Sequence, residues 1–248
     1  MKQSVNENFI LGILGGMGPL AGVELQKKII KLSPAKRDQE HLKMVCFTNP
    51  HVSDRTNCLE QGEDFSVSIA NSLNRLKTFG ADIGVIACNT AHAQIEDIQN
   101  LSDLPLMNII KETVGYIMTT FPDAKKIGLL ATNGTIKSGA YHKCFYDHGL
   151  TEILPDSEMQ EIAMELIYSE TGLKSGFVDN RLNVFVLDSL IENLIVRGAD
   201  IVILGCTEFS MLKINRQKTI DPLNIAARKI IEMAYQKKAQ KDLFCQTD

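Results

Sequence analysis

The stretches GADIGVIAC at Gly80–Cys88 and GADIVILGC at Gly198–Cys206 share one pattern, a Gly-Ala-Asp turn followed by an apolar run and a cysteine. Their separation is 118 residues. Earlier in each half, ILGGMG at Ile13–Gly18 corresponds to LLATNG at Leu129–Gly134, at a separation of 116 residues. Matching segments in the same order indicate a duplicated unit. The alternative explanation is chance, because Gly-Ala-Asp before an apolar strand is common. Chance is the weaker explanation, since a cysteine ends the apolar run at the same position in both segments.

Short apolar runs alternate with longer amphipathic segments along the whole chain. The apolar runs predict strands at Phe9–Leu14, Lys43–Thr48, Ile83–Cys88, Lys126–Ala131, Glu152–Leu154 and Ile201–Cys206. The amphipathic segments predict helices at Pro19–Leu32, Ser157–Tyr168, Val178–Arg197 and Pro222–Gln236. Three more helices are predicted: one that follows a polar loop (Asn49–Gly62) and ends at Phe79, one that begins at about Thr90, and one that follows the strand Lys126–Ala131 and ends at His148. Strands that are apolar on both faces and separated by helices imply parallel sheets covered on both sides.

The fold class is therefore α/β, with two pseudo-symmetric parallel-sheet α/β domains related by internal duplication and the active site in the cleft between them. We expect a first lobe at residues 1–112 plus 222–248 and a second lobe at residues 113–221. This division makes the first lobe discontinuous, because the closing helix is expected to return to it.

Composition excludes several classes of protein. The net charge of −4 argues against a nucleic-acid binder, and six cysteines in 248 residues are too few for a disulfide scaffold. The chain has no Cys-x-x-Cys pair, so a structural zinc site of the usual spacing is not expected. The longest uncharged apolar stretch, Phe9–Val23, is interrupted by five glycines and is too short to span a bilayer, and Glu7 does not suit a secretion signal. The sequence predicts a cytosolic protein with reduced thiols and no membrane partner.

Cys88 and Cys206 are the candidate reactive groups. In open α/β sheets, ligands bind beyond the carboxyl ends of the strands, where both cysteines are placed. Asn89 or Thr90 and Thr207 are expected to cap the helices that follow, and a helix N-terminus lowers the pKa of a thiol toward neutrality. Two thiols facing one ligand suit inversion of a stereocentre, with one as base and the other as acid. The alternative is that both are buried apolar fillers, which is the role expected of Cys46, Cys58, Cys144 and Cys245.

Five segments resemble the aspartate/glutamate racemase family, and most closely its aspartate racemases. They are GGMGP (Gly15–Pro19), NPHVSDRT (Asn49–Thr56), ACNTAH (Ala87–His92), GLKSG (Gly172–Gly176) and GCTE (Gly205–Glu208). The resemblance extends from the N-terminus to about residue 212.

This resemblance implies a cofactor-independent and metal-free racemase that interconverts L- and D-aspartate, with Cys88 and Cys206 as the catalytic acid/base pair. It implies that Arg55 and Lys174 bind the carboxylates of an acidic amino acid. The implied substrate-binding residues are Met17, Gly18, Asp54, Arg55, Thr56, Asn89, Thr90, Ala91, Thr132, Thr135, Lys174, Thr207 and Glu208. A homodimer is also implied.

Alternatives remain open at this stage. Glutamate racemases carry Asp-Ser in the first loop and GCTHYP in the second, whereas this chain has GGMGP and GCTEF, which favours aspartate. Ser53 and the run Phe209–Leu212 depart from the aspartate-type pattern, so glutamate or another acidic amino acid stays an alternative substrate. A related lyase or isomerase of the same superfamily is a further alternative, and a two-lobed solute-binding module is the non-enzyme one. A nucleotide site at Gly16–Ala21 lacks the acidic residue it needs after the second strand.

Overall fold

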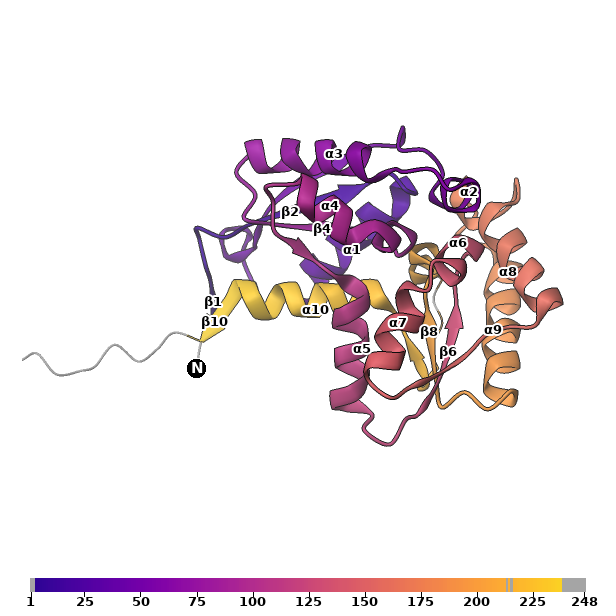
Figure 1. The fold of residues 1–248 in the computed structure, drawn as a ribbon. Helices are drawn as coiled ribbons and strands as arrows, with labels where there is room; N and C mark the ends of the chain where they lie inside the picture. Colours follow the sequence, from indigo (N-terminus) through magenta and orange to yellow (C-terminus); the bar gives the residue numbers. More distant parts are fainter. Residues whose placement is uncertain (1–2, 213, 215, 238–248) are drawn as a thin grey trace, which may run out of the picture.

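Two four-stranded parallel sheets organise the computed structural model, which describes residues 3–212, 214 and 216–237. The first sheet has the order β3-β2-β4-β5, with β2 at Ile10–Gly15, β3 at Lys43–Thr48, β4 at Ile83–Ile86 and β5 at Leu106–Met107. The second has the order β7-β6-β8-β9, with β6 at Lys126–Leu130, β7 at Thr151–Ile153, β8 at Ile201–Leu204 and β9 at Thr219–Ile220. The strand order is the same in both halves, which confirms the predicted pair of parallel-sheet α/β regions (Figure 1).

Helices cover both sheets. In chain order the first five are α1 (Pro19–Leu32), α2 (Arg55–Gln61), α3 (Ser66–Thr78), α4 (Ile95–Leu101) and α5 (Ile109–Thr120). They are followed by α6 (Asn133–Lys137), α7 (Ala140–Asp147), α8 (Ser157–Tyr168), α9 (Arg181–Val196) and α10 (Pro222–Ala234). Side chains of α5 pack mainly with the second sheet, and those of α10 with the first. Four 3-10 turns are η1 (Asp38–Glu40), η2 (Thr90–Gln94), η3 (Leu173–Ser175) and η4 (Thr207–Met211). A small antiparallel pair joins β1 (Gln3–Val5) to β10 (Tyr235–Lys237).

The Gly-Ala-Asp repeat has the same structural role in each half. The Asp82 carboxylate accepts a hydrogen bond at 2.8 Å from the backbone N–H of Ile10, the first residue of β2. The Asp200 carboxylate accepts one at 2.9 Å from the N–H of Lys126, the first residue of β6. Each aspartate thus fixes the start of the neighbouring central strand. The sequence repeat is therefore a repeat of strand pairing as well.

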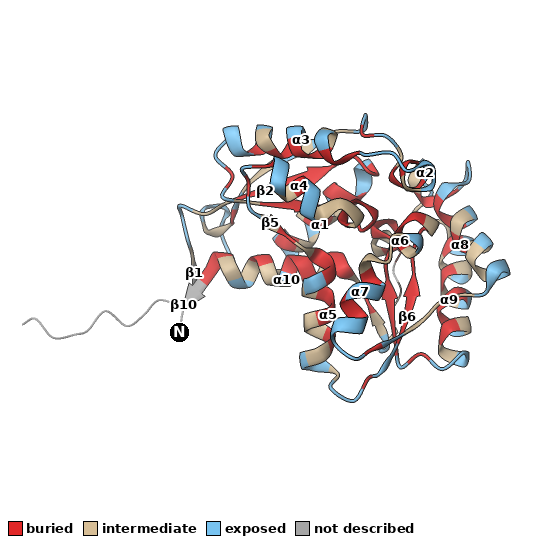
Figure 2. Ribbon diagram, viewed as in Figure 1, coloured by how far each residue is buried: buried red, intermediate tan, exposed pale blue. Residues whose placement is uncertain are grey.

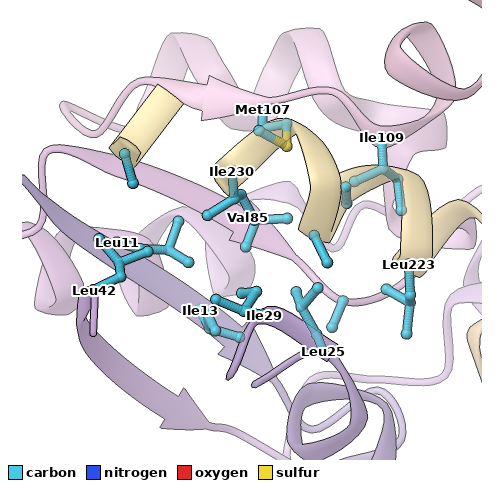
Figure 3. Packing of buried hydrophobic residues seen from close by; sticks show 14 of the residues in the cluster. Leu11, Ile13, Leu25, Ile29, Leu42, Val85, Met107, Ile109, Leu223 and Ile230 are labelled. Atoms are coloured by element: carbon cyan, nitrogen blue, oxygen red, sulfur yellow. The ribbon is translucent and has the colours of Figure 1, made fainter. Parts of the chain in front are cut away.

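The closing helix α10 packs against the first sheet. Its side chains Leu223 and Ile230 lie in one core cluster with Leu11 and Ile13 of β2 and Leu25 of α1 (Figure 3). Figure 1 shows α10 running from the second half back along the first, and Figure 2 shows the inner faces of the helices buried and their outer faces exposed. The lobe limits given above remain a prediction, and residues 238–248 lie outside the described residues.

Several predicted elements differ from the structure. The predicted polar loop Asn49–Gly62 contains α2, because Asp54 caps that helix by accepting from the N–H of Asn57 at 3.0 Å. The helix predicted to end at His148 is two helices, since Gly139 adopts a positive φ of 67° between them. The sequence analysis did not predict α5 at all. No helix in the described part of the chain is long and apolar enough to cross a membrane.

The contact between α2 and α6 joins the two halves beside the pocket described below, and it leaves no room for a side chain at Gly134. A Cβ atom at Gly134 would lie 2.7 Å from the Cα of Thr56 and 2.9 Å from its hydroxyl. We expect Gly134→Ala to lower the free energy of unfolding by about 1–3 kcal/mol, since overpacking forces backbone shifts. Gly115→Ala adds the same methyl group to a helix with nothing within 4 Å, and should be neutral or stabilising. Denaturant unfolding of both variants checks this, and equal stabilities would contradict it.

Candidate active site

A single small pocket collects residues from the carboxyl ends of strands in both sheets. It is lined by Met17, Arg55, Cys88, Asn89, Thr90, Thr132, Tyr168, Lys174, Cys206, Thr207 and Glu208. Ten of these eleven residues are among those predicted from the sequence, and the exception is Tyr168.

Both candidate cysteines reach this pocket by the same route. Each lies two residues beyond the end of a central strand, Cys88 after β4 and Cys206 after β8. Their exposed fractions are 4% and 5%. The Thr207 hydroxyl lies 3.4 Å from the carbonyl oxygen of Ala87, so the two cysteine turns are in contact. The duplicated strands therefore bring both thiols to one cavity, as the sequence pattern predicts.

The predicted helix caps after the cysteines are wrong in detail. The chain enters 3-10 turns at both places, and the residues in the cap positions, Asn89 and Cys206, make no side-chain capping bond. Thr132 is the cap of α6 instead, and its hydroxyl accepts from the N–H of Thr135 at 3.3 Å. The polar groups after each cysteine are consequently available for contacts within the pocket.

Arg55 is fixed by three backbone carbonyls. It is the first residue of α2, not part of a loop as predicted. Its Nη1 donates to the carbonyl oxygens of Val52 at 3.2 Å and Ser53 at 2.8 Å, and its Nη2 donates to that of Met17 at 3.0 Å. Its Nε–H is buried without a hydrogen-bond partner in the described residues. Three of the five guanidinium N–H groups are thus paired with carbonyl oxygens, which leaves Nε–H and the second N–H of Nη2 for Cys88 or a ligand oxygen.

The charge of Arg55 is secured by its neighbours. Burial alone would lower the pKa of Arg55, but negative charge at Cys88 and Asp54 outweighs burial and raises that pKa. The guanidinium therefore stays charged beside Cys88. A buried cation with a free N–H is suited to a carboxylate.

Lys174 is the second cation of the pocket. It comes from η3 in the second half, and its Nζ donates to the Met17 carbonyl oxygen at 3.2 Å. It also lies 5.0 Å from the centre of the Tyr168 ring and 3.7 Å from the Glu208 carboxylate. One carbonyl oxygen thus accepts from both Arg55 and Lys174. This arrangement places the two predicted carboxylate-binding residues at adjacent positions.

Glu208 is a buried carboxylate surrounded by donors. One oxygen accepts from the N–H of Gly18 at 2.9 Å, and the other lies 2.9 Å from the sulfur of Cys206 and 3.2 Å from the Thr207 hydroxyl. Burial would raise the pKa of Glu208, but Lys174 and these hydrogen bonds outweigh it and lower that pKa. Glu208 is therefore an anion within the pocket.

This anion overturns the predicted acidity of Cys206. Burial and the adjacent Glu208 carboxylate raise the pKa of Cys206 well above its usual value, although Lys174 opposes them. The sequence analysis predicted a lowered pKa from the helix terminus, and that prediction is wrong for Cys206. The two thiols occupy unlike surroundings, with a cation beside Cys88 and an anion beside Cys206.

Asn89 is oriented by a tyrosine from the second half. The buried Tyr141 hydroxyl donates to Oδ1 of Asn89 at 2.9 Å. This hydrogen bond orients the Asn89 side-chain amide, so that its nitrogen, Nδ2, points away from Tyr141. That nitrogen is buried with no hydrogen-bond partner in the described residues. The pocket therefore holds two unpaired donors, Nε of Arg55 and Nδ2 of Asn89. Nothing in the sequence around Tyr141 signals this contact.

The remaining predicted residues surround the pocket without lining it. Asp54 and Thr56 contact the Tyr168 hydroxyl, at 3.1 Å and 3.3 Å respectively. Ala91 is buried in the first-half core, and Gly18 reaches the pocket through Glu208. The hydroxyl of Thr135 lies 2.8 Å from that of Thr90 and 3.1 Å from that of Thr132, in a buried triad that crosses between the halves.

His92 does not pair with a thiol. It is fully buried, and burial lowers its pKa to about 4. Its Nε2 accepts from the N–H of Ile109 at 3.3 Å, so Nδ1 carries the proton and donates to the Cys88 carbonyl oxygen at 2.8 Å. His92 thus supports the Cys88 turn. Among the described residues, no group of three or more His, Cys, Asp or Glu side chains is arranged to hold a metal ion.

The chain is similar to known proteins in sequence and in fold. The family model for Asp/Glu/hydantoin racemases matches residues 14–230. The broad specificity amino-acid racemase RacX of Bacillus subtilis is 27% identical over 224 residues, covering 88% of this chain and 93% of that protein. A glutamate racemase of Persephonella marina is 29% identical over 171 residues, covering 68% of this chain and 62% of that protein's length. The solved structure of an aspartate racemase from Picrophilus torridus superposes with a TM-score of 0.77 at 27% identity, covering 93% of this chain and 96% of that one.

The three carbonyls bound by Arg55 make this position sensitive to a change of cation. Lysine keeps the charge but lacks the planar fork, so Arg55→Lys leaves buried carbonyls unpaired. We expect the free energy of unfolding to fall by about 1–3 kcal/mol. Arg75→Lys is the matched control, because Arg75 is exposed and its guanidinium lies 5.5 Å from the centre of the Phe47 ring. Thermal unfolding of both proteins measures the effect, and an unchanged midpoint for Arg55→Lys would refute it.

Proposed function

The chain belongs to the Asp/Glu/hydantoin racemase family, and on this premise we propose that it interconverts L- and D-aspartate by proton transfer between Cys88 and Cys206, without pyridoxal phosphate. The observation that carries the proposal is the presence of two thiols, two cations and two unpaired donors in one small pocket. The Picrophilus torridus aspartate racemase supports aspartate as the substrate, since the two folds correspond over nearly their full lengths.

The proposed chemistry needs a thiolate on one face of the α-carbon and a thiol on the other. The thiolate takes the α-proton, and the electron pair left on carbon delocalises into the α-carboxylate. The opposite thiol then gives its proton to the other face, so the configuration inverts and the two cysteines exchange protonation states. Because the exchange is symmetrical, the same pair serves the reverse reaction.

The cations and donors of the pocket supply binding and stabilise the developing charge. We assign one substrate carboxylate to Nε–H of Arg55 and the Asn89 amide, which are both buried and unpaired. We assign the other to Lys174, whose flexible ammonium acts as a point charge. Positive groups around the carboxylates favour the enolate-like intermediate, which carries more negative charge than the substrate.

Solvent isotope exchange tests the two-thiol reaction. In D₂O without added cofactor or metal, each aspartate enantiomer should yield its mirror image with deuterium on the α-carbon. Cys88→Ser and Cys206→Ser should each reduce inversion by at least ~10²-fold, the usual contribution of an acid/base group. Each variant should keep exchange only for the enantiomer whose proton faces its remaining thiol. Cys144→Ser, at a cysteine outside the pocket, is the control and should retain activity.

The same experiment separates the alternatives. Inversion of glutamate or another acidic amino acid in place of aspartate would change the substrate and keep the reaction. Release of carbon dioxide would indicate a lyase, and binding without any α-deuterium would indicate a solute-binding module. Full turnover in either cysteine variant would refute the two-thiol scheme.

The Tyr141–Asn89 hydrogen bond provides a test of substrate orientation. Tyr141→Phe removes the hydroxyl that fixes the Asn89 amide, and a neutral hydrogen bond contributes about 0.5–1.5 kcal/mol. We therefore expect KM for aspartate to rise roughly 2- to 10-fold, with a smaller change in kcat. Tyr146→Phe is the matched control on the same helix, because Tyr146 is 79% exposed. Steady-state kinetics decide the matter, and identical KM values in the two variants would contradict the assignment.

A homodimer, implied by the family resemblance, and a cytosolic location, predicted from the sequence, are further expectations. Light scattering of the purified protein measures the first, and fractionation of cells that express it measures the second. Neither expectation bears on the proton-transfer chemistry.

A further inference from the structure

The contact between Cys206 and Glu208 requires a shared proton. The sulfur lies 2.9 Å from a carboxylate oxygen, and the carboxylate is 2% exposed. Two anions at that distance, which leaves no room for a water molecule between them, repel strongly. The thiol of Cys206 must therefore donate its hydrogen to Glu208. The hydrogen bond fixes the direction of the thiol as well as its protonation.

The corresponding position in the first half carries no charge. In the internal repeat, Cys88 aligns with Cys206 and Thr90 aligns with Glu208. Thr90 bonds to the hydroxyls of Thr132 and Thr135, at 3.0 Å and 2.8 Å. The duplication has thus kept both cysteines while their partners two residues later differ in charge.

The charged and titratable groups that face Cys206 come from three elements. Glu208 lies on the same turn, η4, and raises the pKa of Cys206, together with burial. Lys174 of η3 opposes this effect. Tyr168 of α8 also lies near the thiol, and burial raises its own pKa, so it is neutral. Arg55 faces Cys88.

We propose that Glu208 is a positioning residue that keeps the proton on Cys206, so that Cys206 enters the first turnover as the acid. The inference rests on the proposed function, because it assigns starting roles within that reaction. The first turnover then moves the α-proton to Cys88 and the Cys206 proton to the α-carbon. Its product state leaves a Cys206 thiolate beside the Glu208 carboxylate, and this repulsion favours return of a proton to Cys206.

The test measures the protonation state of Cys206 directly, in the absence of substrate. In a Cys88→Ser background, the ultraviolet absorbance of the thiolate is followed against pH, and the signal of a protein that also lacks Cys206 is subtracted. We expect Glu208→Gln to move the midpoint to lower pH by about one unit or more, which is tenfold more thiolate at a given pH. Glu165→Gln, at an exposed position on α8, is the control and should leave the midpoint unchanged.

A second variant keeps the test decisive if Glu208→Gln folds poorly. Lys174→Met removes the opposing cation, so the midpoint should move to higher pH. Thermal unfolding of each variant establishes that it is folded before titration. A midpoint that moves in neither Glu208→Gln nor Lys174→Met would overturn the inference.

The exchange of α-deuterium in the same Cys88→Ser background adds a functional readout. Only Cys206 remains as base there, so the exchange rate should rise with pH along the thiolate titration and shift with Glu208→Gln. A shifted titration without exchange of any acidic amino acid would support the control of Cys206 by Glu208 and refute the proposed function. Exchange with an unshifted titration would refute the inference and leave the function standing.

Discussion

The pocket depends on the burial of two cations against a single carbonyl oxygen, that of Met17. Arg55 and Lys174 come from different halves of the chain and donate to it at 3.0 Å and 3.2 Å. Removing charges from water costs several kcal/mol per ion unless partners compensate, and like charges repel. Glu208 offsets part of this cost, at 3.7 Å from Lys174. Two cations against one carboxylate leave positive charge beside Cys88, which suits the thiolate and the dicarboxylic substrate proposed above.

The duplicated sheets bring the two cysteines to this arrangement from equivalent positions. Each central strand ends two residues before its cysteine, and Asp82 and Asp200 fix the strands that pair with them. Because the strand ends are rigid and the residues beyond them are irregular, the halves present reactive groups on stable supports. The turns touch through Thr207 and the Ala87 carbonyl. Strand register thus sets the positions of the two thiols, while Arg55 comes from α2 and Lys174 from η3.

The sequence was informative where chemistry and structure are local. The strand ends at Cys88 and Cys206 follow from apolar runs, and Arg55 and Lys174 follow from motifs. Tyr168 was missed because it reaches the pocket from the last residue of α8, where nothing nearby in sequence marks it. The acidity of Cys206 was misjudged because it depends on the direction of the Glu208 side chain, which the sequence does not specify. Contacts between distant segments are what the sequence left out.

The unlike partners of the two cysteines raise a question of symmetry. Enantiomers have equal free energies, so kcat/KM of a racemase must be the same in both directions whatever the surroundings of its thiols. A carboxylate beside Cys206 and a hydroxyl at the equivalent position, Thr90, cannot bias the product. These two groups determine which protonation state of the thiols is occupied before substrate binds. They therefore determine the individual values of kcat and KM in each direction, while the ratio kcat/KM stays equal. An asymmetric site on a duplicated scaffold is therefore compatible with racemisation, because thermodynamics constrains the ratio and leaves the resting state free.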